Sequence, residues 1–226
     1  MISAEPAYLV LLGVVGLAAG LFLNGVIVHV PTGGSAVSRS ERFAVRYALV
    51  VLSNAGLWVA AGLRFGPHLM VAPYLALFSV LLALSVIDLE RYILPNRITY
   101  PSILGSLVVI PAVALTLGRP DGIVHALVGG AGYFAFLFVP ALIYPRGMGF
   151  GDVKLAGLMG LYLGWIHPLL TLLSLVMASV IGLAAGLMVL VVRRGKSRPY
   201  PFGPWLAMGC VLAILFSRPL LARYGV

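Results

Sequence analysis

Charged side chains are scarce in this chain. Aspartate, glutamate, lysine and arginine make up 9% of its 226 residues, against about 25% in an average soluble domain. Hydrophobic residues account for 62%, and apolar stretches of about 20 residues, the length that a helix needs to cross a bilayer core, recur along the chain. These proportions exclude a soluble globular domain. They predict an all-α, polytopic membrane protein that forms a single membrane-embedded domain over residues 1–226.

Cysteine is almost absent as well. The single residue, Cys210, lies inside an apolar run, so the chain can form neither an internal disulfide nor a cysteine-based zinc cluster. The histidines are His29, His68, His125 and His167. They lack the spacing of metal ligands, such as H-x-x-x-H. We therefore predict no metal site.

Turn signals rich in proline, glycine and charge separate eight predicted helices. Their ranges are 7–30, 44–63, 68–88, 98–117, 122–144, 152–166, 168–192 and 202–222. The first is preceded by Glu5 instead of a basic segment and is followed by many more apolar spans, so we interpret it as a retained helix and not as a signal peptide. The sixth is short and rich in glycine, and a re-entrant element is the alternative to a full span.

Basic residues are unevenly distributed between the two sides of the predicted bundle. When the loops between the predicted helices are numbered in chain order, the odd-numbered loops lie on one side and contain most of the lysine and arginine residues. The other side contains only Arg64, Arg119, Arg218 and Arg223. Because basic loops stay on the cytoplasmic side, both termini are predicted to lie outside. A re-entrant sixth helix would remove this contrast. The net charge of +9 lies in short loops at span ends, which favours anionic lipid as the counterpart and argues against nucleic acid.

Only six acidic side chains are present, and two of them stand at unusual positions. Asp88 ends an apolar run in LALSVIDLERYILPN, and Asp152 precedes another in GMGFGDVKL. Acids at membrane depth are costly and are functional hypotheses by default. The predicted topology places both on the cytoplasmic side, together with LPN (94–96) and YPFGP (200–204).

Each carboxylate also has a purely structural interpretation. Asp152, directly before an apolar helix, can be its N-cap, and Asp88 can pair with Arg91 or Arg97. The functional interpretation takes the two acids together. A helix start favours an ionised carboxylate and a helix end a neutral one, and such a pair supplies a general base and a general acid. An aspartic protease needs this pair, one member to activate water and the other to protonate the scissile carbonyl.

Four separated segments resemble the motifs of one known family, in the expected order. They are GLAAGLFLNGVIVHVP (16–31), IDLERYILPN (87–96), GFGDVKL (149–155) and YPFGPWLAMG (200–209). The third is similar to a GxGD-x-K-L signature, the second to an aspartate motif ending in L-P-N or L-P-D, and the fourth to a P-F-G-P segment that opens the last helix. These are motifs of the type IV prepilin peptidases, the GxGD membrane aspartic proteases.

The resemblance implies an endopeptidase of the bacterial inner membrane. Its implied activity is removal of the basic leader from type IV prepilins or pseudopilins at the cytoplasmic face, with no cofactor needed for cleavage. The implied catalytic pair is Asp88 and Asp152. Supporting positions in the matching motifs are Gly149, Gly151, Lys154, Pro95 and Asn96. The role of the lysine does not follow from the match; a charge near Asp152 and a lipid contact are both open. Substrate-binding residues are not indicated.

The sequence departs from the family between its first two predicted helices. Many bacterial members carry there a cytoplasmic insert with two C-x-x-C pairs, which binds zinc and is associated with N-methylation of the new N-terminus. Here the connection is PTGGSAVSRSERF (31–43), which contains no cysteine. The resemblance therefore does not extend to methylation, and S-adenosylmethionine is expected only if methyltransferase activity is retained.

Two other functions are compatible with the same carboxylates. A proton-coupled small-solute transporter could use Asp88 and Asp152 as a relay, but it would be expected to show inverted repeats and helices interrupted near the midplane, and no clear repeat is visible. An inactive membrane scaffold could keep the fold, although the intact pair of aspartates argues against it.

Overall fold

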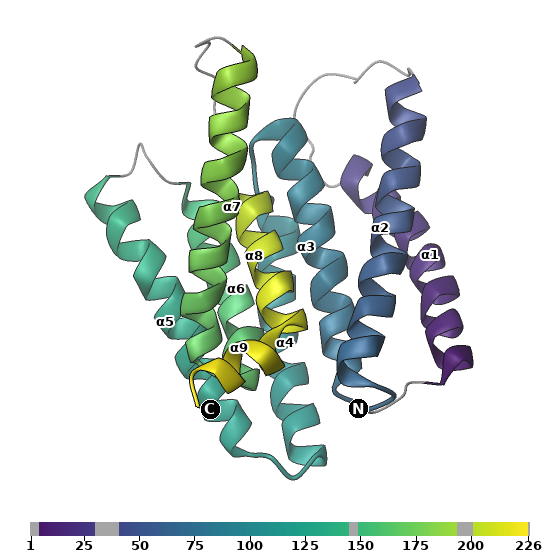
Figure 1. Cartoon of the computed structure of the whole chain (residues 1–226), viewed down its shortest axis with the longest axis vertical. Coiled ribbons are helices and arrows are strands. Elements are labelled where there is room, and N and C mark those ends of the chain that lie inside the picture. The colour runs from purple at the N-terminus through teal and green to yellow at the C-terminus, as the bar shows by residue number, and fades with distance from the viewer. Residues whose placement is uncertain (1–4, 30–40, 145–148, 194–200, 226) are drawn as a thin grey trace. The chain divides into compact units, whose positions relative to one another are not determined.

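The computed structural model describes residues 5–29, 41–144, 149–193 and 201–225. Within these ranges all regular structure is helical, which confirms the all-α class (Figure 1). The helices are α1 (Pro6–His29), α2 (Glu41–Phe65), α3 (Val71–Arg91), α4 (Asn96–Thr116), α5 (Asp121–Ile143), α6 (Phe150–Ile166), α7 (Leu169–Arg193), α8 (Gly203–Leu215) and α9 (Ser217–Arg223).

The first seven helices agree with the predicted ranges to within a few residues. The ends are set by residues that cannot continue a helix, such as Pro95, which precedes α4 with an extended backbone (φ −69°, ψ 127°). The orientation was predicted from the distribution of basic residues, and many of these lie in residues 30–40, 145–148 and 194–200, outside the described residues. The orientation in the membrane therefore stays a prediction.

The prediction of a single last helix over residues 202–222 is wrong. The chain leaves the helix at Phe216 (φ −97°, ψ 16°), and the axes of α8 and α9 are bent by 75°. Pro219 explains the break, because in a continuous helix its ring would clash with the carbonyl of Leu215, four residues earlier. The hydroxyl of Ser217 donates a hydrogen bond of 2.7 Å to the carbonyl of Ile214 and so stabilises the end of α8.

Six stretches within the described residues are long and apolar enough to cross a membrane, which makes this a multi-pass membrane protein. They belong to α1, α2, α3, α4, α5 and α7, and a seventh is added if the bent pair α8–α9 counts as one span. α6 has only 17 residues and is not among them. In the part of the chain that the structure describes, six or seven spans thus qualify by length and composition, against about eight predicted.

Residues 1–87 form one compact unit, which holds α1, α2 and most of α3. Buried polar side chains join these helices. The Nδ2 atom of Asn54 donates to the carbonyl of Gly16 at 2.8 Å, and the hydroxyl of Ser79 donates to Oδ1 of Asn54 at 2.8 Å. Because lipid offers no hydrogen-bond partners, such contacts help to specify how helices pair.

The second unit begins at Asp88, and α6 is its central helix. α4, α5, α7 and α8 pack against α6, and most of its side chains from Val153 to Trp165 are buried. An apolar helix surrounded in this way gains contacts on every side, which explains why α6 can be hydrophobic all round. Its N-terminal turn is left at one end of the bundle.

Two kinds of contact set the position of α6. Glycines bring α5 and α6 together, since a β-carbon on Gly129 would lie 2.6 Å from Cα of Gly164. On the α4 side, the hydroxyls of Ser106 and Tyr162 form a buried hydrogen bond of 2.9 Å. Small residues at such interfaces let helix backbones approach closely, so the axial position of α6 is specified.

Candidate active site

Asp88 lies in the last turn of α3 and is 6% exposed. Immediately after this helix, the backbone N–H of Tyr92 donates to the carbonyl of Asp88 at 2.8 Å. Tyr92 has φ 57°, in the left-handed region that large side chains rarely adopt. This residue turns the chain away from α3, and Pro95 then fixes the backbone for entry into α4.

Asp152 lies in the first turn of α6, where its side chain is half-buried. The N-cap is Gly149 (φ −70°, ψ 134°), whose carbonyl accepts a hydrogen bond of 3.0 Å from the N–H of Asp152. The interpretation of Asp152 as the N-cap is therefore wrong, because the helix already begins at Phe150. A carboxylate in the first turn still lies at the electropositive end of the helix.

The two aspartates meet at Gly203, the first residue of α8. A β-carbon at Gly203 would lie 2.7 Å from Oδ2 of Asp88 and 3.5 Å from Oδ1 of Asp152. The sum of these distances, 6.2 Å, is an upper limit on the separation of the two oxygens. Only glycine leaves enough room here for both carboxylates.

The close approach of two carboxylates has an electrostatic consequence. Two negative charges at this separation, one on a buried side chain and the other on a half-buried one, repel each other strongly. A pair that carries one proton avoids this repulsion, and it then holds a proton acceptor and a proton donor side by side. The arrangement can therefore take a proton from a water molecule and give one to a neighbouring oxygen.

The turn between α3 and α4 contacts the first turn of α6 at two points. A β-carbon on Gly151 would lie 2.9 Å from Cβ of Leu94, so this glycine is needed for the close contact. The Nζ atom of Lys154 donates a hydrogen bond of 2.8 Å to Oδ1 of Asn96. The supporting residues predicted in the two aspartate motifs thus include two that touch across the helices, Lys154 and Asn96.

Gly203 was not singled out from the sequence. The signal was present, because YPFGP was predicted to lie on the same side as the aspartates, and its glycine directly precedes the apolar run of α8. Glycine is frequent throughout this chain, with 27 residues, so composition could not distinguish this one. Its role depends on two side chains that only the packing of three helices brings to it.

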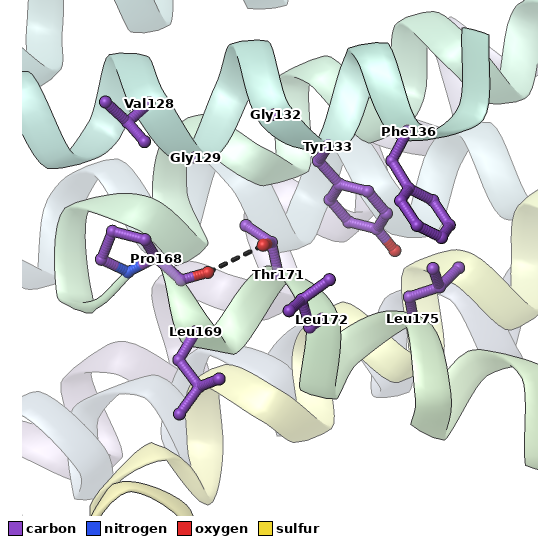
Figure 2. Close-up of a pocket in the computed structure, with 10 residues that line it drawn as sticks. All are labelled: Val128, Gly129, Gly132, Tyr133, Phe136, Pro168, Leu169, Thr171, Leu172 and Leu175. Atoms are coloured by element: carbon purple, nitrogen blue, oxygen red, sulfur yellow. Dashed lines mark hydrogen bonds between the residues drawn. The ribbon is translucent and has the colours of Figure 1, made fainter. Parts of the chain in front are cut away.

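An apolar pocket lies elsewhere in the same unit. It has a volume of about 410 Å³ and lies between α5 and α7, where Val128, Phe136, Leu172 and Leu175 are part of its wall (Figure 2). The pocket reaches Pro168, beyond the last residue of α6, whereas Asp152 is in the first turn. None of Asp88, Asp152 and Gly203 lines this pocket.

Comparison with known proteins identifies the family. The model of the type IV leader peptidase family matches residues 75–195. The prepilin leader peptidase/N-methyltransferase of Bacillus subtilis (strain 168) is 33% identical over 195 residues, which cover 84% of this chain and 74% of that protein. The protein of the same name from Pseudomonas putida is 34% identical over 201 residues, 87% of this chain and 68% of that protein.

A third relative, from Aeromonas hydrophila, is 32% identical over 182 residues, 79% of this chain and 61% of that protein, so this chain spans less than two thirds of its length. It carries the same name, prepilin leader peptidase/N-methyltransferase. No solved structure matches significantly. The region matched by the family model contains both Asp88 and Asp152. The chain belongs to the type IV leader peptidase family.

Proposed function

We propose that this protein is a membrane aspartic endopeptidase, which removes the basic leader from type IV prepilin-like or pseudopilin substrates at the cytoplasmic membrane face. The observation that carries the proposal is the meeting of Asp88 and Asp152 at Gly203, with two of their oxygens no more than 6.2 Å apart. Membership in the leader peptidase family supports the reaction class, and the two carboxylates supply the chemistry.

In the proposed reaction the two carboxyl groups share one proton. The ionised member takes a proton from a water molecule, whose oxygen attacks the carbonyl carbon of the scissile amide. The protonated member donates its proton to the carbonyl oxygen, which gives a tetrahedral diol. Return of a proton to the amide nitrogen then breaks the carbon–nitrogen bond. We assign the ionised state to Asp152, at the start of α6, and the protonated state to Asp88, at the end of α3.

The substrate is proposed to pass along the glycines before Asp152. A β-carbon on Gly149 would lie 3.6 Å from Oδ2 of Asp152, so a peptide strand lying over this glycine comes close to the carboxylate. The family resemblance favours cleavage after a small residue, glycine in the family. The basic leader would be held by anionic lipid headgroups and by particular acids such as Glu90, which is exposed just beyond Asp88.

N-methylation is not part of the proposal. The relatives are named as methyltransferases as well, but the connection 31–43 of this chain lacks the cysteines of the family's zinc-binding insert. The transporter alternative receives less support than the peptidase, because the family match favours a peptidase. The inactive scaffold is the alternative that only an assay can test.

The test is cleavage of a candidate prepilin by the purified protein in lipid, followed by mass spectrometry of the new N-terminus. Asp88→Asn and Asp152→Asn keep the side-chain volume but remove the acid, and each is expected to abolish leader removal. Asp121→Asn, the same change at the exposed start of α5, is the matched control and should cleave like the wild type. Full activity in either active-site variant would rule out the pair.

The same experiment with S-adenosylmethionine measures methylation, because a methyl group changes the mass of the product. We expect no mass increase. If the wild type cleaves none of several pilin-like substrates while it remains folded, the scaffold becomes the better interpretation.

A further inference from the structure

The side chain of Lys154 turns away from the aspartate that precedes it in the sequence. Residues two positions apart on a helix do not face each other, so Lys154 and Asp152 project to different sides of α6. The Nζ atom of Lys154 lies 2.8 Å from Oδ1 of Asn96, 4.7 Å from the ring centre of Tyr100 and 4.9 Å from that of Phe150. Lys154 therefore contacts the first turn of α4.

The four residues of this contact come in two helical pairs. Asn96 and Tyr100 are four positions apart on α4, as Phe150 and Lys154 are on α6, so each pair shares one helix face. The ammonium lies between these faces, where it donates a hydrogen bond to the amide and lies near two aromatic rings. Cations over ring faces are attracted by the electron-rich π-system. The lysine thus joins the start of α4 to the start of α6.

The segment that Lys154 holds is the one that follows Asp88. Between Asp88 and Asn96 the chain passes through Tyr92, with its left-handed φ of 57°, and then through Pro95. A bulky residue in this conformation persists only where its surroundings hold it. Leu94 against Gly151, and Asn96 against Lys154, are two such contacts with α6. The residues on either side of Asp152 therefore hold the segment that follows Asp88.

We propose that Lys154 is a positioning residue of the peptidase. By holding Asn96, and with it the turn after Asp88, against the first turn of α6, it sets the separation of the Asp88 and Asp152 carboxylates. The proposal rests on the proposed function for its chemical consequence, while the helix contact itself is independent of that function. A direct effect of the lysine charge on substrate, or a lipid contact, would give different results in the experiments below.

The first experiment is a kinetic double-mutant cycle. Lys154→Met keeps an apolar stem but removes the charge and the donor, and we expect kcat to fall about 10- to 100-fold with little change in KM, the scale of loss caused by a small misplacement of reacting groups. Asn96→Ala removes the same contact from the other side and should cause a similar loss. Lys154→Arg keeps a donor and a cation over the rings and should retain most of the activity.

The double variant distinguishes positioning from the alternatives. If both residues act through their mutual contact, Lys154→Met with Asn96→Ala should be no slower than the slower single variant. Losses that multiply, or wild-type kcat in Lys154→Met, would overturn the proposal. Thermal midpoints of all variants are measured in the same detergent. If Lys154→Met does not fold, Asn96→Ala, at an exposed position, still removes the hydrogen bond and supplies the test.

The second experiment does not depend on catalysis. Asp88→Cys and Asp152→Cys are combined in a Cys210→Ala background, which removes the only native cysteine, and a short bifunctional thiol reagent measures how readily the two positions are bridged. Lys154→Met should slow bridging several-fold, and Lys154→Arg should not. Unchanged bridging beside a reduced kcat would overturn the proposal. If bridging depends on Lys154 but the wild type cleaves no prepilin, the proposed function fails and the positioning role stands.

Discussion

The first residue of α8, Gly203, packs against the carboxylate of Asp88 in the last turn of α3, and a β-carbon on this glycine would lie 2.7 Å from Oδ2 of Asp88. Asp152 lies beside the same glycine. The start of α8 thus completes a site whose acids come from two other helices.

Gly203→Ala is expected to reduce cleavage by at least about 100-fold, because misplacing reacting groups by about 1 Å costs a factor of this order. The added β-carbon would lie 2.7 Å from Oδ2 of Asp88, and the carboxylate would have to move. The initial rate of leader removal measures the effect. Gly105→Ala on α4 is the matched control, since nothing lies within 4 Å of the added carbon. Equal rates for the two variants would contradict the geometry described here.

Gly151→Ala is expected to lower both activity and the thermal midpoint. The new β-carbon would lie 2.9 Å from Cβ of Leu94 and push the α3–α4 turn away from α6. At Gly149 the nearest neighbour is 3.6 Å away, an ordinary van der Waals distance, so Gly149→Ala should keep the wild-type thermal midpoint. Thermal unfolding in detergent compares the two. A lower midpoint in Gly149→Ala than in Gly151→Ala would be inconsistent with this contact.

Gly129→Ala is expected to destabilise the fold by about 1–3 kcal/mol, the usual cost of overpacking a close interface. The added carbon would lie 2.6 Å from Cα of Gly164 and force α5 and α6 apart. Gly132→Ala, on the same helix, has nothing within 4 Å and serves as the control. Folded yield and thermal midpoint are the measurements. The prediction fails if the two variants have the same midpoint.

Leader removal is expected to continue after treatment with a strong chelator such as EDTA. In the proposed mechanism the carboxyl groups of Asp88 and Asp152 perform both proton transfers, and no step needs a bound cation. The rate before and after dialysis against the chelator measures this. Loss of activity that returns on addition of Zn²⁺ would show that the mechanism is incomplete.

The helices could be predicted because their signals are local. Apolar runs of about 20 residues, ended by proline, glycine and charge, placed α1 to α7 to within a few residues. The break between α8 and α9 was missed, although Pro219 was visible, because the apolar pattern continued beyond it. The start of α6 was placed after Gly151 for a similar reason, since an aspartate before an apolar run is typical of an N-cap.

By itself the sequence determined the class of the protein and its reactive groups. A chain that is 62% hydrophobic must bury its helices in lipid or against one another, and its few acids stand out for that reason. The order of the motifs around Asp88 and Asp152 indicated the family. The class of protein follows from amino-acid composition, and the family follows from the order of short motifs along the chain. Neither inference requires knowledge of contacts between helices.

Only the tertiary structure decided which groups meet. Asp88 and Asp152 come from helices far apart in the sequence, and the axial position of α6 against its neighbours determines whether their side chains lie together. The same packing brings Gly203 between them and directs Lys154 toward Asn96. Each of these contacts depends on distances of a few ångströms between helices, and such distances follow from the packing of many side chains, which no single motif specifies.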